Sequence, residues 1–236
     1  MPQILHAEPA EKLTALRNCS YFNGLGEAIL IKLAEEMRLV RFARGEILFW
    51  QGDPSAGLQI IREGSVKLFK LSPQGRELII NTYEDGATFN EVSVFDNGVN
   101  PVNVAALEDS DVWILSPELI QETLYQHPEM GRAVIQNLAR NLRMMVGIVE
   151  ELSFYQVTNR LARLLSQLPP DQLSGEASSR ITQDQLAARL GTVREVVSRS
   201  LRELERSGAI RVYRRQIEVI DPAALELWAQ GPYNEP

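Results

Sequence analysis

Cysteine and histidine are nearly absent from this chain, and their scarcity excludes several classes of protein. Cys19 is the single cysteine, so the sequence can form neither an internal disulfide nor the cysteine sets that hold zinc or iron–sulfur clusters. His6 and His127 are isolated from each other, and no Ser-His-Asp or Cys-His set is evident. We therefore predict no metal, no cofactor, no catalytic residue and no enzyme activity.

Long apolar runs are missing as well. No stretch approaches the roughly 20 apolar residues that a membrane-spanning helix needs. The N-terminus, MPQILHAEPAEKL, lacks the basic start and the apolar segment of a secretory signal. A chain of 236 residues can nevertheless bury a sizeable core. We expect a cytoplasmic protein without a membrane partner.

Lysine disappears after Lys70, so the cations of the C-terminal part are all arginines. Residues 180–215 hold nine arginines against four acidic residues, a local charge of +5. The whole chain carries −7, which leaves −12 for the remainder. Arginine suits bidentate contacts with phosphate or guanine. Because many basic patches are only solvated surfaces, the motif inside this segment has to decide its role.

Turn-forming glycines punctuate residues 39–117. They stand at positions 45, 52, 64, 75 and 86, and short β-rich runs such as LQIIR and SVKLFKL lie between them. This spacing predicts a sandwich or barrel-like β-domain. Residues 8–38 and 118–168 carry helical spacing instead. Residues 181–220 form a separate unit, which follows the polar linker PPDQLSGEASS.

The helical segment 130–153 carries a heptad-like seam. Six apolar residues step along it by four, four, three, four and three positions: Val134, Leu138, Leu142, Met145, Val149 and Leu152. Ile135, Met144 and Ile148 add a second apolar flank. A helix packed only on its own domain is the simpler interpretation. Two flanks favour a helix that faces the β-domain on one side and a second chain on the other, so we predict a homodimer interface here.

The C-terminal unit contains two candidate capping boxes in ITQDQLAARLGTVREVVSRSLRELERSGAI. Thr182 with Gln185 is expected to start one helix, and Thr192 with Glu195 the next. Gly191 between them suits a tight turn. The second helix should turn four apolar residues inward: Val193, Val197, Leu201 and Leu204.

The opposite face of that second helix carries polar residues. Arg194, Glu195, Ser198 and Arg199 lie together near its N-terminal end. The following AIRVYRRQIEVID is typical of a β-hairpin, with Arg214 and Arg215 near its tip. The pattern predicts a winged helix-turn-helix whose second helix enters the major groove of DNA.

These motifs resemble those of the CRP/FNR family of bacterial transcription regulators over nearly the whole chain. GEILFWQGDPSAGLQIIREGSVKLFK resembles the opening of its β-roll, and SFYQVTNRLARLL resembles the junction from its dimer helix to its DNA-binding domain. GTVREVVSRSLREL resembles its recognition helix. The resemblance implies an α+β fold: a β-roll sensor domain resembling a cyclic-nucleotide-binding domain, a long dimerisation helix, and a C-terminal winged helix-turn-helix. We place these parts at residues 1–125, 126–155 and 156–236.

The resemblance weakens at the effector pocket. Cyclic-nucleotide binders of the family carry FGE, whose Glu takes the ribose hydroxyl, and further on an Arg that clamps the cyclic phosphate. Here Phe89-Asn90-Glu91 keeps the acid, but Asn100-Pro101 stands in place of the clamp. A buried phosphate without a cation is costly, so cyclic AMP is not expected. The family's adenine-contacting residues fall on Met145 and Val146, which are apolar. The candidate pocket comprises Phe89, Asn90, Glu91, Asn100, Pro101, Val102, Asn103 and Met145.

Three classes of function remain distinguishable. The first is a homodimeric regulator that reads a palindromic operator with TGTGA-like or TTGA-like half-sites. Its partners are double-stranded DNA, RNA polymerase and an unidentified uncharged or apolar effector, if it has one. The second is an effector-binding regulatory module that acts on a protein partner, and the third is an enzyme built on the β-roll. The arginine-bearing helix favours the first. Its expected DNA contacts are Thr182, Gln183, Thr192, Arg194, Glu195, Val196, Ser198, Arg199 and Arg215.

Overall fold

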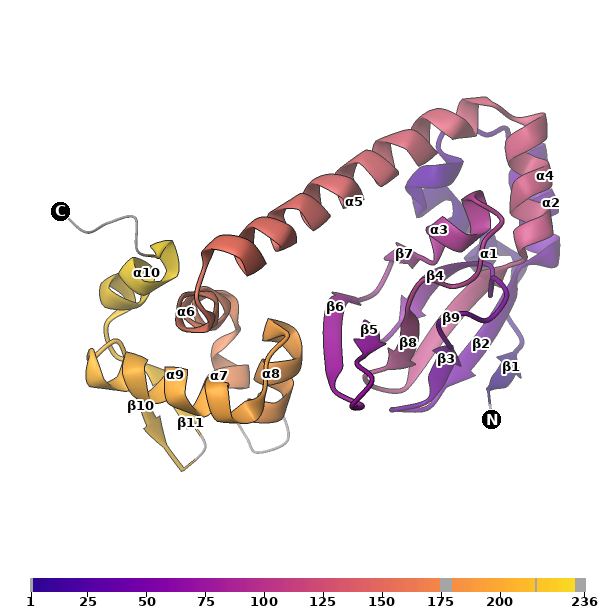
Figure 1. Cartoon of the computed structure of the whole chain (residues 1–236). Coiled ribbons are helices and arrows are strands. Elements are labelled where there is room, and N and C mark those ends of the chain that lie inside the picture. The colour runs from indigo at the N-terminus through magenta and orange to yellow at the C-terminus, as the bar shows by residue number, and fades with distance from the viewer. Residues whose placement is uncertain (1, 175–179, 215, 232–236) are drawn as a thin grey trace. The chain divides into compact units, whose positions relative to one another are not determined.

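A computed structural model describes residues 2–174, 180–214 and 216–231 (Figure 1). Its contacts divide the chain into two compact units. One consists of residues 1–70 with 80–142, and the other of residues 71–79 with 143–236. The division at 142/143 falls within a single helix, α5 (Glu129–Phe154).

Two antiparallel sheets form the β-roll that the sequence predicts. The larger has the strand order β1-β2-β9-β4-β7 and the smaller β3-β8-β5-β6. The strands are β1 (Gln3–Leu5), β2 (Arg38–Phe42), β3 (Ile47–Phe49), β4 (Leu58–Glu63), β5 (Val66–Leu71), β6 (Glu77–Tyr83), β7 (Thr88–Phe89), β8 (Asn103–Ala106) and β9 (Ser110–Leu115). The expected β-domain over residues 39–117 is confirmed, and β1 adds an edge strand that the sequence did not indicate.

Alternation along the strands of the larger sheet divides its side chains between two cores. On β9, Val112 faces a core shared with the smaller sheet, where Phe49, Val66 and Val104 also pack. Trp113 faces the other way, into a core with the first helices. Because successive side chains point to opposite faces of a strand, one sheet can support both layers. The sensor unit is therefore built around its larger sheet.

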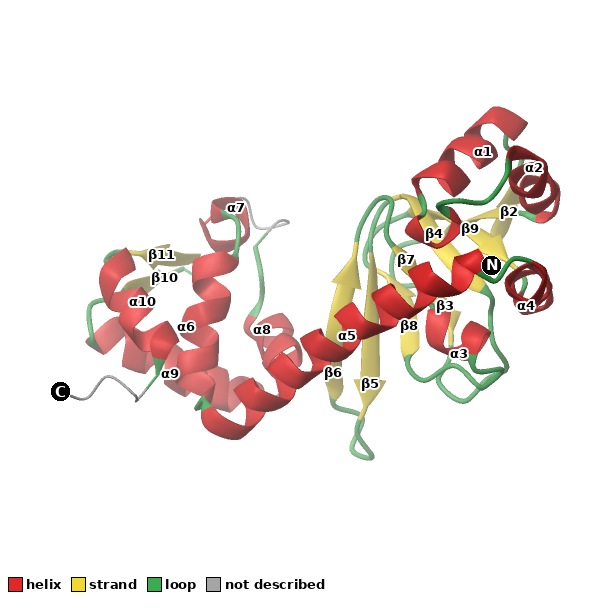
Figure 2. Ribbon diagram, turned by 90° about the horizontal axis from the view of Figure 1, so that it is seen from above, coloured by secondary structure: helices red, strands yellow, loops and turns green. Residues whose placement is uncertain are grey.

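Helices cover the outer face of that sheet, and Figure 2 shows them beside β2, β4 and β9. They are α1 (Pro9–Asn18), the short 3₁₀ helix η1 (Ser20–Phe22), α2 (Glu27–Glu36), α4 (Pro117–Gln126) and the start of α5. The helical spacing over residues 8–38 and 118–168 predicts these elements correctly. A further short helix, α3 (Glu91–Phe95), interrupts the β-rich region and was not expected.

The second unit has its own core, which contains Leu161, Leu186, Leu201 and Ile217. Its elements are α6 (Val157–Gln167), α7 (Pro170–Ser174), α8 (Gln183–Leu190), α9 (Arg194–Arg206), β10 (Ile210–Tyr213), β11 (Gln216–Val219) and α10 (Pro222–Gln230). Part of the expected linker forms α7 instead, because Leu173 is buried in this core. The rest of the linker, residues 175–179, lies outside the described part of the chain. Among the described residues, no helix is both long enough and apolar enough to cross a bilayer.

Candidate nucleic-acid interface and sensor cavity

The first predicted capping box starts α8. Thr182 Oγ1 accepts a hydrogen bond of 3.1 Å from the Gln185 N–H, and Gln185 Oε1 accepts one of 2.8 Å from the Thr182 N–H. Gly191 ends the helix with a φ of 63°, in the left-handed region that favours glycine. The helix-turn-helix corner is thus set by local sequence, as predicted.

The second predicted capping box is wrong. Helix α9 begins at Arg194 and its N-cap residue is Val193, with no side-chain cap among the described residues. The N–H of Thr192 donates to Ala187 O over 3.0 Å, so Thr192 belongs to the turn that closes α8. It precedes the N-cap, which places Glu195 at the second helical position rather than the third that a capping box needs.

Helix α9 has one buried and one exposed face. Val197, Leu201 and Leu204 are buried in the domain core. Arg194, Glu195 and Arg199 are exposed, and Val196 and Ser198 are half-buried beside them. Val193, expected to point inward, is also only half-buried. Residues three and four positions apart are neighbours on a helix surface, so Arg194 with Ser198 and Glu195 with Arg199 form one continuous surface.

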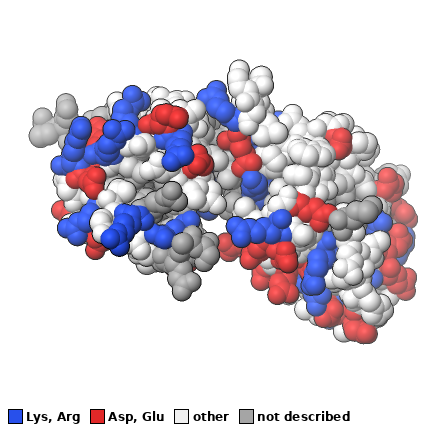
Figure 3. All heavy atoms as spheres, turned by 90° about the horizontal axis from the view of Figure 1, so that it is seen from below, with Lys and Arg blue, Asp and Glu red and all other residues white. Residues whose placement is uncertain are grey.

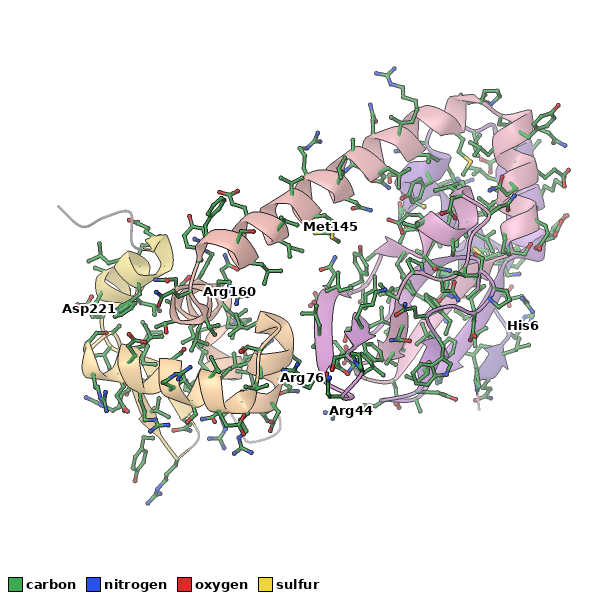
Figure 4. The ribbon with its side chains drawn as sticks, viewed as in Figure 1. His6, Arg44, Arg76, Met145, Arg160 and Asp221 are labelled. Carbon is green, nitrogen blue, oxygen red and sulfur yellow. The ribbon has the colours of Figure 1, made fainter. Side chains whose placement is uncertain are left out.

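Side chains from α6 hold α9 from its inner side. The hydroxyls of Thr158 and Ser200 are 2.9 Å apart, and Thr158 Oγ1 also donates to Glu203 Oε2 over 2.8 Å. Arg160, also on α6, donates to Leu190 O at the end of α8 over 2.8 Å (Figure 4). Burial lowers the pKa of this guanidinium. The sequence analysis missed these anchors, because a single hydroxyl at an inward helix position carries no distinctive pattern.

A basic wing adjoins α9. Arg214, in the turn directly after β10, has a φ of 46°, and its guanidinium carbon lies 5.0 Å from the centre of the Tyr213 ring. Arg180 donates to Arg214 O over 3.2 Å and so brings a second cation to the wing. Arg215, a predicted DNA contact, lies outside the described residues. Figure 3 shows blue arginine side chains gathered over this unit.

Asn100, a residue of the predicted effector pocket, makes hydrogen bonds within the protein. This residue is 1% exposed, and its side chain is turned into the loop before β4. Its Nδ2 donates to Pro54 O over 3.0 Å, and its Oδ1 accepts from the Ala56 N–H over 3.2 Å. The side chain therefore braces the loop, and a ligand finds no group of Asn100 to bind.

Neighbouring residues of the predicted pocket also have structural roles. Asn103 accepts from the Gln51 N–H and donates to Phe69 O, and Asn90 donates to Gly57 O. Phe89 is buried in the core between the sheets. Pro101 and Val102 are half-buried. Neither Asn100 nor any of these residues lines the cavity that the structure shows beside Glu91.

A cavity of 260 Å³ does lie beside Glu91. It is lined by Asn18, Cys19, Ser20, Tyr83, Gly86, Ala87, Thr88, Glu91, Asn137 and Asn141. Glu91 is the only member of the predicted pocket among them. Met145, on α5 (Figure 4), is not a lining residue. The polar residues that α5 contributes are Asn137 and Asn141, which the sequence analysis did not single out.

Glu91 is 7% exposed, and Asn141 Nδ2 donates to its Oε1 over 2.6 Å. Burial raises the pKa of this carboxyl, while its own backbone N–H and the side chains of Asn141 and Tyr21 oppose the rise. Burial likewise raises the pKa of the Cys19 thiol, whose sulfur lies 3.4 Å from Thr88 Oγ1. The cavity thus holds a carboxyl group whose hydrogen-bond donors are neutral.

The predicted dimer seam on α5 needs one correction. Val134 is buried and Leu138 half-buried against the sensor core, so Val134 is not available to a second chain. Ile135 is 69% exposed in its place. An exposed apolar stripe then continues along the helix through Leu142, Met145, Val149 and Leu152. Its steps from Ile135 are seven, three, four and three residues, which keeps the heptad spacing.

Comparison with known proteins identifies the two halves of the chain. Residues 39–127 match the cyclic nucleotide-binding domain, and residues 159–228 match the Crp-like helix-turn-helix domain. The cyclic AMP receptor protein of Thermus thermophilus is 30% identical over 217 residues, which cover 92% of this chain and 99% of the relative. The chain belongs to the CRP/FNR family. It is thus a CRP-like transcription regulator with a DNA-binding helix-turn-helix.

Other CRP/FNR proteins extend the likeness. A CRP-like cAMP-activated global transcriptional regulator of Mycobacterium tuberculosis is 26% identical over 215 residues, which cover 89% of this chain and 96% of the relative. The crystal structure of a CRP/FNR regulator from Eubacterium rectale has a TM-score of 0.78 at 20% identity. It covers 91% of this chain and all of that one, a similarity of fold. The CRP/FNR family is one of transcription regulators and not of enzymes.

Proposed function

We propose that this regulator acts as a homodimer that reads an inverted DNA repeat with TGTGA-like or TTGA-like arms. The observation that supports this most directly is the outer face of α9. Its arginines are exposed, while its inner face is fixed by the domain core and by Thr158. A helix held in this way can present side chains to base edges at a defined depth in the major groove.

Base contacts are assigned by chemistry. Arg194 and Arg199 each offer a planar fork that matches guanine O6 and N7. Glu195 can accept a hydrogen bond from cytosine N4, and the methyl groups of Val196 suit the thymine methyl. The exposed Asp184 carboxylate lies 3.8 Å from the Arg194 guanidinium. We expect a contact between Arg194 and DNA to replace this ion pair on binding. Binding at Arg194 is therefore expected to cost little in desolvation.

Thr182, Gln183 and Thr192 lie at the two ends of α8. The N-terminal turn of a helix carries free N–H groups and a partial positive charge, which favour a phosphate. Thr182 caps this turn, and Gln183 is its first residue. We assign the three residues to the DNA backbone, where they set the register of α9 without reading sequence.

Dimerisation rests on the exposed stripe of α5. Four of its five residues, Ile135, Leu142, Val149 and Leu152, are between 51% and 69% exposed. Large apolar side chains in this arrangement usually mark an interface. A second copy that packs on the stripe buries them and supplies a second recognition helix, as an inverted repeat requires.

The test of DNA reading is selection of binding sites from random duplexes, followed by affinity measurements with two matched variants. Arg199→Ala should weaken the selected site by about 1–3 kcal/mol and relax selectivity at one base pair. Arg214→Ala, a wing residue assigned to phosphate, should weaken all sequences alike and reduce the salt slope by about one unit. If Arg199→Ala affects selected and random DNA equally, the assignment to a base is wrong.

Cyclic AMP is not proposed as the effector, although the names of the relatives from Thermus thermophilus and Mycobacterium tuberculosis refer to it. Asn100 stands where the family's clamp is expected, and it is bound to Pro54 and Ala56. A ligand that binds only the folded protein raises its melting temperature. Micromolar cyclic AMP should leave the melting temperature unchanged, and a rise of several degrees would contradict this proposal. RNA polymerase as a partner and a cytoplasmic location follow from the same function.

A further inference from the structure

The cavity beside Glu91 is walled by segments that are distant in sequence. The end of α1, the segment before β7, the start of α3 and the first half of α5 all contribute lining residues. Its volume of 260 Å³ lies just below the range typical of drug-sized ligands, about 300–1,000 Å³. The cavity therefore suits a small molecule.

The residues that line this cavity carry charge of one sign. Glu91 supplies a carboxyl group, and neither lysine nor arginine occurs among the described residues that line the walls. The C-terminal end of α1 contributes Asn18 and its C-cap residue Cys19. Carbonyl groups at the end of a helix carry a partial negative charge. Both features favour a positive ligand and disfavour an anion.

An aromatic ring and neutral polar groups complete the site. Tyr83 lines the cavity, and its ring stacks on Phe89 at a centroid distance of 6.1 Å, which holds it in place. The face of a tyrosine ring attracts ammonium groups. Thr88 and Asn141 offer oxygen acceptors for the hydrogen atoms of an ammonium group. The oxygen of Asn137 is already engaged, because the exposed Arg140 donates a hydrogen bond to it.

We propose that this cavity binds a small organic cation, with its ammonium group against the Glu91 carboxylate and its carbon chain beside Tyr83. Binding replaces the missing countercharge of a buried carboxylate, which neutral donors alone stabilise poorly. The proposal of this binding site does not depend on whether the protein binds DNA, whereas the role of the cation as an effector rests on the proposed function.

The experiment compares isosteric probes on the intact protein by calorimetric titration. n-Butylamine should bind, n-butanol should bind at least about tenfold more weakly, and butyrate should not bind detectably, because only the amine supplies a positive charge. The amine stays protonated between about pH 5 and pH 8, whereas Glu91, whose pKa burial raises, ionises over a range shifted upward. Amine affinity should therefore rise with pH as Glu91 ionises. The other titratable groups that face Glu91 are Cys19, Tyr21 and Tyr83, and burial raises the pKa of each.

Glu91→Gln keeps the shape of the side chain and removes its charge. It should weaken n-butylamine binding at least about tenfold and abolish the rise of affinity with pH. Glu35→Gln, a matched change at an exposed position of α2, should alter neither. Equal binding of amine and alcohol to the unmodified protein overturns the proposal, and this comparison does not depend on any variant folding.

The same preparations separate this proposal from the proposed function. DNA binding by the unmodified protein is measured without amine, and then with n-butylamine at saturation. Amine binding without DNA binding refutes the proposed DNA reading and leaves the cation site intact. DNA binding with no amine binding at any pH refutes the cation site alone.

Discussion

Asn100 offers a direct test of whether position 100 braces a loop or binds a ligand. Asn100→Ala removes the donor to Pro54 O and the acceptor of the Ala56 N–H. Trp50 O and Ser93 Oγ, which also contact Asn100, keep other partners in Asp53 N and Ser55 Oγ respectively. Two backbone groups are thus left unsatisfied next to a buried side chain.

An unsatisfied buried polar group costs about 1–3 kcal/mol. The two groups lie in a partly buried loop, where water reaches some of the vacated space, so we expect Asn100→Ala to cost about 2–4 kcal/mol. For a protein of this size, each kcal/mol lowers the melting temperature by about 2–4 °C, which gives a drop of about 5–15 °C for the sensor unit. Differential scanning calorimetry measures this drop directly.

Two further variants are needed to interpret the result for Asn100→Ala. Asn23→Ala, a change at an exposed asparagine, should stay within about 0.5 kcal/mol of the unmodified protein. Asn100→Arg restores the cation that the family's nucleotide pockets use, but it also breaks the loop contacts, so it should destabilise the protein without conferring cyclic AMP binding. The reasoning is refuted if Asn100→Ala is as stable as the Asn23 control, or if Asn100→Arg binds the nucleotide at undiminished stability.

Three other outcomes are expected. Leu142→Glu places a charge in the exposed stripe, so it should yield monomers in analytical ultracentrifugation and lose operator binding; an intact dimer would contradict the interface. Thr182→Ala should cost about 1 kcal/mol in urea unfolding because it removes a true N-cap, whereas Thr192→Ala should cost less than half of that; equal losses would revive the second capping box. Because burial raises the pKa of Glu91 in the folded protein, this residue contributes most to stability below its unfolded-state pKa of about 4.3. That contribution is lost as the pH rises through its folded-state pKa. Glu91→Gln cannot ionise, so it should be more stable than the unmodified protein at neutral pH. A difference in stability between the two proteins that stays constant from pH 4 to 8 would rule out burial of the charge.

The helix-turn-helix was predictable because its signals are local. Thr182, Gln185 and Gly191 act on backbone groups within a few residues, so sequence spacing is sufficient to place them. The position of Val193 is less well specified, since a hydroxyl two residues before a helix looks much like an N-cap in sequence. The error at Thr192 follows from that one-residue ambiguity.

The sensor pocket could not be read from the sequence, because its walls come from distant segments. The Asn100 side chain is hydrogen-bonded to a loop more than forty positions earlier in the sequence. Asn141 is hydrogen-bonded to Glu91, fifty positions away. The phase of α5 was ambiguous for another reason. Val134 and Ile135 are both apolar and lie 100° apart on the helix, so periodicity alone did not show which of them faces the sensor core.

Helix α5 carries Asn141 in the wall of the cavity and Leu142 in the exposed stripe, as consecutive residues. The two share one rigid turn of backbone, with their side chains about 100° apart around the axis. A ligand that shifts the backbone at Asn141 would therefore move Leu142 with it. Under the proposals above, a ligand that turns α5 about its axis would present the stripe differently to a second copy, which would sense the change as a shift in knob-into-hole register.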